Sequence, residues 1–199
     1  MVRVGISVEG TTEEKFIKQV LAPYFSVKNI YLTAISLGGD VNVDKVSTEL
    51  KKLANNFDHV TTFYDFYGFK QVDADETKAS LEDKILARVH DNIKTKLIPF
   101  VQNYEFEGLL FSDPESMGLV LKSNKVTEWA QDILDQFGGD PERINNSRQT
   151  APSKRLIAHT DYRKTTHGPK IAKEMGIDKI REMCAGFNAW LTEIEALEQ

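Results

Sequence analysis

Short apolar, β-branched runs alternate with amphipathic runs through the first hundred residues, and this alternation constrains the fold more than any other feature. Runs at 2–8, 30–37 and 60–64 have the composition of buried strands. The stretches 11–21 and 43–53 place apolar residues at the three- and four-residue spacing of helices. Strands that alternate with helices imply right-handed crossovers and a largely parallel sheet. We therefore expect an α/β protein with a mainly parallel sheet flanked by helices.

The remaining elements follow from local signals. Thr11 and Glu14 have the spacing of a capping box, so a helix should begin directly after Glu9. A strand is expected at 97–103, and Pro99 within it favours an edge position. Further helices are expected at 76–95, from 114 onward, at 126–137, and as one long amphipathic helix at 177–197. We expect an α/β core at 1–112 and a helical C-terminal extension at 113–199, packed together as one compact domain.

Composition excludes several classes of protein. With 199 residues, 41% hydrophobic and 28% charged, the chain can bury a full core. No apolar stretch approaches the roughly 20 residues needed to cross a bilayer, so we expect a cytoplasmic protein without a membrane partner. The single cysteine, Cys184, excludes an intrachain disulfide and a zinc site built from cysteines. Its apolar surroundings in the sequence predict core packing.

The net charge of −5 argues against a protein that simply coats nucleic acid. The segment 148–173 differs from this average, because it carries seven lysine and arginine residues and one aspartate. That segment could contact a phosphate backbone. A solvated charged face is the alternative.

Two acids stand at the ends of predicted strands. Glu9 follows the first strand, and Asp65 follows the third. Ligands of open α/β sheets bind outside the carboxyl ends of the strands, so both acids could face one crevice. Two carboxylates there indicate a divalent metal and phosphate chemistry. The alternatives are a helix-terminal charge for Glu9 and a turn residue for Asp65.

Two more acids follow the strand expected at 97–103. Glu105 and Glu107 share one face if the chain is extended, and either could be an additional metal ligand. Glu105 is preferred because it lies closest to the strand end. Glu13 and Glu14 are assigned to the first turn of a helix.

Lys164 and His167 are the best basic candidates. A lysine could neutralise charge on a phosphoryl oxygen, and a histidine could orient or protonate the leaving oxygen. The adjacent Gly168 and Pro169 favour a loop in this region. A loop or capping role is the alternative for His167.

Four blocks of sequence together carry a family resemblance. They are Glu9-Gly-Thr-Thr-Glu13, Asp65-Phe-Tyr-Gly68, the stretch from Pro99 through Glu105-Phe-Glu107 to Asp113, and Tyr162-Arg-Lys-Thr-Thr-His-Gly-Pro169. They resemble the TOPRIM-like prokaryotic family first catalogued as a domain of unknown function (the DUF4276 type), which includes the effector nuclease of the PARIS anti-phage system. The resemblance continues to Leu191 and so covers nearly the whole chain.

The resemblance implies a TOPRIM-like, Rossmann-like fold, as in topoisomerases, primases and OLD-type nucleases. In such folds a glutamate after the first strand and an Asp-x-Asp after a later strand handle Mg²⁺ and phosphodiesters. Glu9 matches the glutamate and Asp65 the first aspartate. Tyr67 stands at the second aspartate position, which departs from the wider pattern. Either another acid completes the site, or the metal is held weakly.

The expected function is therefore a metal-dependent nuclease that hydrolyses RNA or DNA with Mg²⁺ or Mn²⁺. The resemblance further implies a toxic effector in anti-phage defence, restrained by a partner ATPase, and a homodimer. The alternatives are a non-catalytic module that binds phosphate or a partner, and an enzyme of nucleotidyl or phosphoryl transfer. The predicted site has catalytic residues Glu9, Asp65, Lys164 and His167, metal ligands Glu9, Asp65, Glu105 and Glu107, and nucleic-acid contacts Arg155, Arg163, Lys164 and Lys170.

Overall fold

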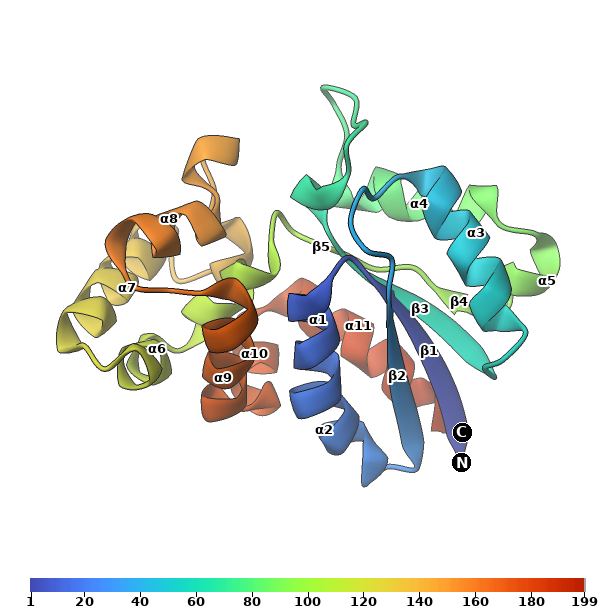
Figure 1. Ribbon diagram of the computed structural model, residues 1–199, viewed down its shortest axis with the longest axis horizontal. Helices are drawn as coiled ribbons and strands as arrows, with labels where there is room; N and C mark the ends of the chain where they lie inside the picture. The colour runs from blue at the N-terminus through green and yellow to red at the C-terminus, as the bar shows by residue number, and fades with distance from the viewer. Residues whose placement is uncertain (199) are drawn as a thin grey trace.

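The chain forms a five-stranded parallel sheet, seen in a computed structural model that describes residues 1–198 (Figure 1). The strand order is β2-β1-β3-β4, and β5 also pairs with β3. Every pair is parallel. The α/β class and the parallel sheet are thus confirmed. The strands are β1 (Val2–Val8), β2 (Ile30–Ser36), β3 (His59–Asp65), β4 (Leu97–Ile98) and β5 (Val101–Gln102).

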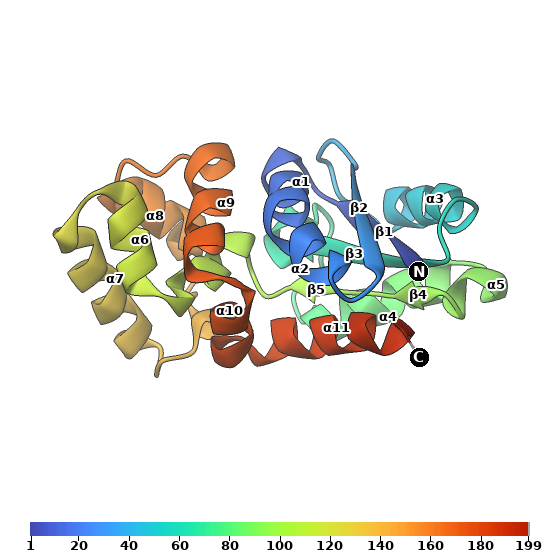
Figure 2. The same ribbon diagram turned by 90° about the horizontal axis from the view of Figure 1, so that it is seen from below.

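Helices flank the sheet because both faces of its central strands are apolar. One hydrophobic cluster joins β1 and β2 to α1 (Thr11–Phe16), the π-helical turn η1 (Ile17–Leu21), α2 (Ala22–Ser26) and α11 (Ala185–Glu195). A second cluster joins β3 to α3 (Val43–Ala54) and α4 (Lys78–Arg88). Figure 1 shows α3 and α4 across the strands from α1 and α2, and Figure 2 shows α11 running along the sheet near β4.

The strand predicted at 97–103 exists as two short pieces at the sheet edge, as its proline suggested. Val60 pairs with Leu97 and Tyr64 with Val101, so β4 and β5 keep one register on either side of Pro99. The Thr62 hydroxyl replaces the missing ladder bonds. Its Oγ1 accepts from the Phe100 N–H at 2.8 Å and donates to the Phe100 carbonyl at 2.7 Å.

The second half of the chain is helical. Helices α6 (Pro114–Leu121), α7 (Asn124–Gln136) and α8 (Pro152–His159) lie beyond α9 (Lys164–Met175) and α10 (Ile177–Met183), on the side away from α3 and α4 (Figure 1). Phe106, Leu110 and Phe111 belong to the same hydrophobic cluster as Phe16 and Phe63, so the helical part packs directly on the sheet part. Residue 199, the end of the predicted extension, lies outside the described residues. The elements after β5 are η3 (Phe106–Ser112), α6 (Pro114–Leu121), α7 (Asn124–Gln136), η4 (Pro141–Arg143), η5 (Arg148–Thr150), α8 (Pro152–His159), α9 (Lys164–Met175), α10 (Ile177–Met183), α11 and η6 (Ala196–Glu198).

Two predicted helices are each interrupted. The helix expected at 76–95 is divided into α4 and α5 (Asp91–Lys94), because Val89 is extended and its side chain enters the second hydrophobic cluster. The helix expected at 177–197 breaks at Cys184 into α10 and α11. The carboxylate of Glu142 accepts hydrogen bonds from the N–H groups of Gly186 and Phe187, at 2.7 and 3.1 Å, and so caps the new helix start. Cys184 itself is buried, as expected.

The loop expected around Lys164 is wrong, because this residue begins α9 and Pro169 lies inside that helix. A proline cannot donate to the carbonyl four residues earlier, here that of Thr165. The Nζ of Lys15 donates to that carbonyl instead, at 3.1 Å. A contact from a distant helix therefore satisfies the group that the proline leaves free.

The first helix also begins differently from the prediction. Gly10 is its N-cap, and the Glu13 carboxylate accepts from the Gly10 N–H at 3.0 Å. Glu14 instead forms an ion pair with Lys18 at 2.6 Å. The capping box is thus one residue earlier than expected, and this turns Glu13 back towards Glu9.

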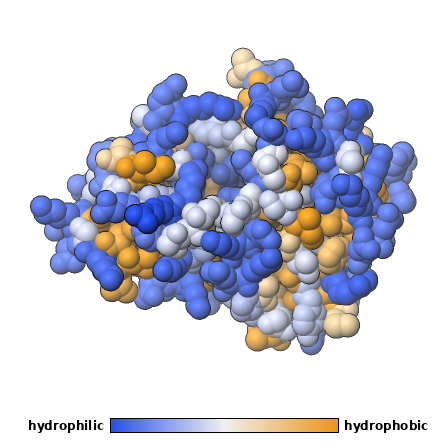
Figure 3. Space-filling model, viewed as in Figure 1, coloured by the Kyte–Doolittle hydropathy of each residue, from blue (hydrophilic) through white to orange (hydrophobic). Residues whose placement is uncertain are grey.

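The surface facing the viewer in Figure 1 is mostly hydrophilic. Figure 3 shows hydrophobic side chains in separate patches rather than one continuous band. Among the described residues, no helix is long and apolar enough to cross a membrane.

Candidate functional site

A cluster of acids gathers at the carboxyl ends of β1, β3 and β5. Glu9 follows β1, Asp65 ends β3, and Glu105 and Glu107 follow β5. These ends meet in the middle of the molecule, beside α1 and near α9 (Figure 1). Asp65 lies close enough to the other acids for each of them to raise its pKa. The structure therefore places the four predicted metal ligands at one edge of the sheet. Among residues 1–198, however, no three acid, histidine or cysteine side chains are grouped so that they could hold a metal ion.

Glu9 is held in a confined position. A Cβ added to Gly68 would lie only 2.0 Å from its Oε2, so the carboxylate packs directly on that glycine. Among the described residues, this buried Oε2 has no hydrogen-bond partner. Burial raises the pKa of Glu9 to about 7, and Glu13 and Glu105 add to the rise while Lys164 opposes it.

Asp65 is anchored by one backbone contact. Its Oδ1 accepts a hydrogen bond from the Phe106 N–H at 2.7 Å, at the start of η3. Burial raises its pKa well above the usual value, and the neighbouring acids raise it further, Glu13 most and then Glu107 and Glu9. Several negative charges in a buried place repel one another, so the cluster favours either bound protons or a bound cation.

Glu107 is buried beside two donors, one just before α9 and one at its first residue. The Tyr162 hydroxyl donates to its Oε1 at 3.2 Å, and the Lys164 Nζ lies 3.4 Å from the same oxygen. Burial raises the pKa of Glu107 to about 7 against the opposing effect of Lys164, and Glu105 and Glu13 add to the rise. Burial lowers the pKa of Lys164, but Glu107, Glu105 and Asp65 outweigh that effect and raise it. Lys164 therefore remains a cation beside the acids.

Glu105 has a different set of contacts. Its Oε2 accepts from the Ser153 N–H at 2.8 Å, and its Oε1 accepts from the Ser153 hydroxyl at 2.9 Å. Ser153 lies in the first turn of α8, where backbone N–H groups lack partners within the helix. Glu105 therefore caps α8 and ties it to the end of β5.

Sequence reasoning missed three members of this site. Glu13 is buried and acts on the pKa of Glu9, Asp65 and Glu107, although it was assigned only to the first helical turn. Its spacing of three from Gly10 is the signal that could have placed it. Tyr162 is two residues before Lys164, inside the block that carried the resemblance. Ser153 had no sequence signal.

The other predicted basic residues lie outside the acid cluster. His167 caps α9, because its Nδ1 accepts from the Arg163 N–H at 3.1 Å. Burial lowers the pKa of His167, as do Lys170 and Arg163, and Asp161 opposes them. The Nε of Arg155 donates to the Thr150 carbonyl at 2.7 Å. Arg163, the N-cap of α9, and Lys170, within that helix, are both exposed.

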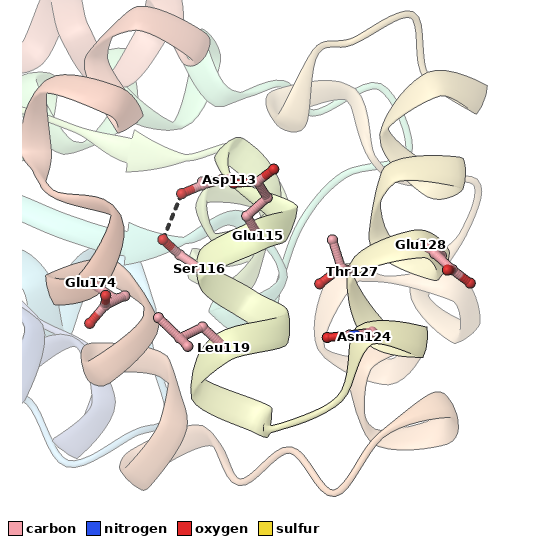
Figure 4. Close-up of a pocket in the computed structure, with 8 residues that line it drawn as sticks. All are labelled: Asp113, Glu115, Ser116, Leu119, Asn124, Thr127, Glu128 and Glu174. Atoms are coloured by element: carbon pink, nitrogen blue, oxygen red, sulfur yellow. Dashed lines mark hydrogen bonds between the residues drawn. The ribbon is translucent and has the colours of Figure 1, made fainter.

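A separate groove lies between α6, α7 and the end of α9. It has a volume of about 570 Å³ and contains none of the acids described above. Figure 4 shows its carboxylates on all three helices. At the start of α6 the Ser116 hydroxyl donates a hydrogen bond to the Asp113 carboxylate. The lining residues are Asp113, Glu115, Ser116, Leu119, Asn124, Thr127, Glu128 and Glu174.

Comparisons with known proteins extend over nearly the whole chain. The family described as Domain of unknown function (DUF4276) matches residues 8–195. No curated protein matches. Among solved structures, the C-terminal region of the Burkholderia pseudomallei OLD protein is similar with a TM-score of 0.54 and 17% identity, covering 100% of both chains. The C-terminal region of the Xanthomonas campestris pv. campestris OLD protein has a TM-score of 0.51 and 19% identity, covering 99% of this chain and 94% of that one. At these identities the likeness shows a shared fold.

Proposed function

The chain belongs to the DUF4276 family, a domain of unknown function, and we propose from its own site residues that it is a metal-dependent nuclease. The proposed reaction is hydrolysis of a phosphodiester in RNA or DNA. The oxygen of a water molecule forms a bond to phosphorus, and one ester P–O bond breaks. The leaving oxygen takes up a proton, and the attacking water loses one. The products are a phosphate monoester end and a hydroxyl end.

The observation that carries this proposal is the convergence of Glu9, Asp65 and Glu107 with Lys164 at the strand ends. The effects of these groups on one another's pKa values support this placement. Buried acids without matching donors are unfavourable for folding, and groups with pKa values perturbed in this way are concentrated at sites of binding or catalysis. The shared fold with the C-terminal regions of OLD proteins supports the TOPRIM-like interpretation.

The chemistry of the site fits a hard divalent cation. Its donors are carboxylate oxygens, which Mg²⁺ and Mn²⁺ prefer, and Oε2 of Glu9, which has no hydrogen-bond partner among the described residues, would be available as a ligand. Within residues 1–198, no group of three or more acid, histidine or cysteine side chains is placed to hold a metal ion, so the protein would supply fewer ligands than three. Mg²⁺ usually keeps several waters and needs only one or two carboxylates when a substrate phosphate is present. We therefore propose Glu9 and Asp65 as the main ligands.

The structure separates the two remaining candidates. Both oxygens of Glu105 accept from Ser153, whereas Glu107 faces Lys164 directly. We propose Glu107 as the additional acid of the site and Glu105 as the residue that positions α8.

When bound, the cation would polarise a phosphoryl oxygen and lower the pKa of a coordinated water. Lys164 would donate to a non-bridging oxygen of the phosphate, where negative charge develops. His167 lies outside the acid cluster and its Nδ1 accepts from Arg163, so its expected role at the leaving oxygen stays a prediction. Arg155, Arg163 and Lys170 would contact neighbouring phosphates.

The deciding experiment incubates purified protein with labelled tRNA, single-stranded DNA and duplex DNA in Mg²⁺, in Mn²⁺ and in EDTA. Glu9→Gln and Asp65→Asn remove one charge each, and Glu14→Gln is the matched control, because Glu14 lies close to Glu9 in the chain, in α1, but pairs with Lys18. We expect metal-dependent cutting that Glu14→Gln retains and the other two variants lose by at least about 100-fold. Cutting that persists in folded Glu9→Gln and Asp65→Asn would contradict the proposal.

If no substrate is cut and both variants bind nucleic acid as wild type does, the non-catalytic binding module is the better description. The presence of Tyr67 at the second aspartate position favours that alternative. The roles as a toxic effector with a partner ATPase, and the homodimer, rest on the family resemblance and stay predictions.

A further inference from the structure

Two partly exposed aromatic rings lie beside Asp65. Tyr67 is two residues beyond it along the chain, and Tyr104 is two residues beyond Gln102, its direct partner in the sheet. The ring centroids of Tyr67 and Tyr104 are 5.6 Å apart with an interplanar angle of 41°. The pair therefore stands at the same strand ends as the acid cluster.

Several contacts hold this pair in place. The Tyr67 N–H donates to the Tyr104 carbonyl at 3.0 Å. The Asn145 side-chain amide donates to the Tyr67 hydroxyl at 2.6 Å. Tyr104 has a φ of 59°, a left-handed conformation that bulky residues rarely adopt. The chain turns sharply after β5, and this turn places the Tyr104 ring beside Tyr67.

An arginine completes the group. The guanidinium carbon of Arg148 lies 4.9 Å from the centroid of the Tyr67 ring, and the residue is exposed. A guanidinium is planar and cationic, so it can stack on a flat ring and also attract a phosphate. Tyr67, Tyr104 and Arg148, here called the stacking group, thus combine aromatic faces with a positive charge next to the proposed cleavage site.

We propose that the stacking group binds an unpaired nucleobase adjacent to the phosphate held at the acid cluster. The substrate is then single-stranded or locally unpaired nucleic acid rather than continuous duplex. Aromatic and arginine faces bind bases that are splayed out of a helix, whereas bases inside a duplex already stack on each other. This inference rests on the proposed function for its placement next to the cut, but its binding step is separately measurable.

The overall charge of the protein agrees with this mode of binding. A net charge of −5 gives little general attraction for a polyanion. Stacking supplies affinity that does not depend on neutralising many phosphates. It also gives Tyr67 a function at the position where the wider TOPRIM pattern has an acid.

The test measures binding without cleavage, by fluorescence anisotropy of a labelled single strand and of its blunt duplex, with Ca²⁺ in place of Mg²⁺ and also in EDTA. Tyr104→Gly removes the ring and suits the left-handed backbone, so it should fold. Tyr104→Phe keeps the ring. Tyr31→Ala removes an exposed tyrosine on β2, outside the site, and serves as the matched control. Circular dichroism checks that each variant is folded.

We expect the wild type to prefer the single strand and Tyr104→Gly to weaken single-strand binding by about tenfold or more, while Tyr104→Phe and Tyr31→Ala change it less than about twofold. Arg148→Gln should weaken binding. It should also reduce the slope of log affinity against log salt concentration by about 1, as expected for the loss of one phosphate contact. Equal affinity for strand and duplex, or unchanged strand binding by folded Tyr104→Gly, would overturn the inference. If the wild type cuts no substrate but Tyr104→Gly still loses single-strand binding, the stacking group is supported and the nuclease proposal is contradicted.

Discussion

The partly buried carboxylate of Glu9 destabilises the folded protein, and its surroundings relieve this cost only in part, through Lys164. Its carboxylate lies against Gly68 with one oxygen buried and, among the described residues, without a partner. Other acids surround it, and burial raises its pKa to about 7. A side chain in this position is unfavourable as an anion until a cation joins it, which is common for residues that serve function rather than stability.

We expect Glu9→Gln to stabilise the metal-free protein. At pH 8 the variant removes a buried charge whose pKa of about 7 reflects a cost on the order of 2 kcal/mol relative to the unfolded chain. Urea unfolding at pH 8 in EDTA should show a higher free energy of unfolding for Glu9→Gln than for wild type. An unchanged or lower value would mean that the Glu9 charge is already compensated within the protein.

Gly68 should also be needed for activity, because the Glu9 carboxylate packs against it. A methyl group there would lie 2.0 Å from Oε2 of Glu9 and force the carboxylate away. Gly68→Ala is therefore expected to lower cleavage by tenfold or more in a folded protein. In Gly10→Ala the added methyl is 3.6 Å from the nearest atom, an ordinary contact, so this variant is the steric control. Full activity in Gly68→Ala would show that Glu9 is free to move.

At the scale of elements, α9 is the helix that brings Lys164 to the acids. Its first turns depend on contacts from other parts of the chain, because Pro169 leaves the Thr165 carbonyl to Lys15. Tyr162, just before the helix, donates to Glu107. A Cβ on Gly168 would lie 2.8 Å from the Tyr162 hydroxyl and 3.0 Å from the Phe106 ring, so this glycine allows α9 to approach η3 closely.

Lys15→Met should lower the free energy of unfolding by about 1 kcal/mol, since it leaves the Thr165 carbonyl without its donor. Lys18→Met removes only the surface ion pair with Glu14 and should change stability by less than about 0.5 kcal/mol. Both values come from urea unfolding at one pH. If both variants change the free energy of unfolding equally, the Lys15 contact does not stabilise α9.

The elements that could be predicted from the sequence are those with local signals. Strands with continuous apolar runs and helices with regular spacing lie where expected, and Glu9 and Asp65 stand at their strand ends. The errors come from distant contacts. Glu142 starts α11 from more than forty residues away, and Lys15 supports the start of α9 across 150 residues. Glu13 joined the site only because Gly10, not Thr11, caps the first helix.

For the whole molecule, the acid cluster predicts how stability changes with pH in the absence of metal. The pKa values of Glu9 and Glu107 rise from 4.5 to about 7 on folding. The folded state then binds more protons than the unfolded state between those values, so the contribution of these groups falls as pH rises from about 4.5 to about 7 and is level above that.

Urea unfolding in EDTA at pH 5, 6, 7 and 8 measures this dependence. The difference in stability between Glu9→Gln and wild type isolates the Glu9 contribution, and it should grow in favour of the variant as pH rises to about 7. A difference that stays constant across this range would show that Glu9 ionises in the folded protein as it does in the unfolded chain.

Titration of Mn²⁺ into the folded protein, followed by electron paramagnetic resonance at pH 7.5, measures whether the acid cluster binds a cation. We expect binding by wild type and by Glu14→Gln, and affinity at least tenfold weaker in Glu9→Gln and in Asp65→Asn. Mn²⁺ binding of equal strength in all four proteins, or in none, would contradict the proposed cation site.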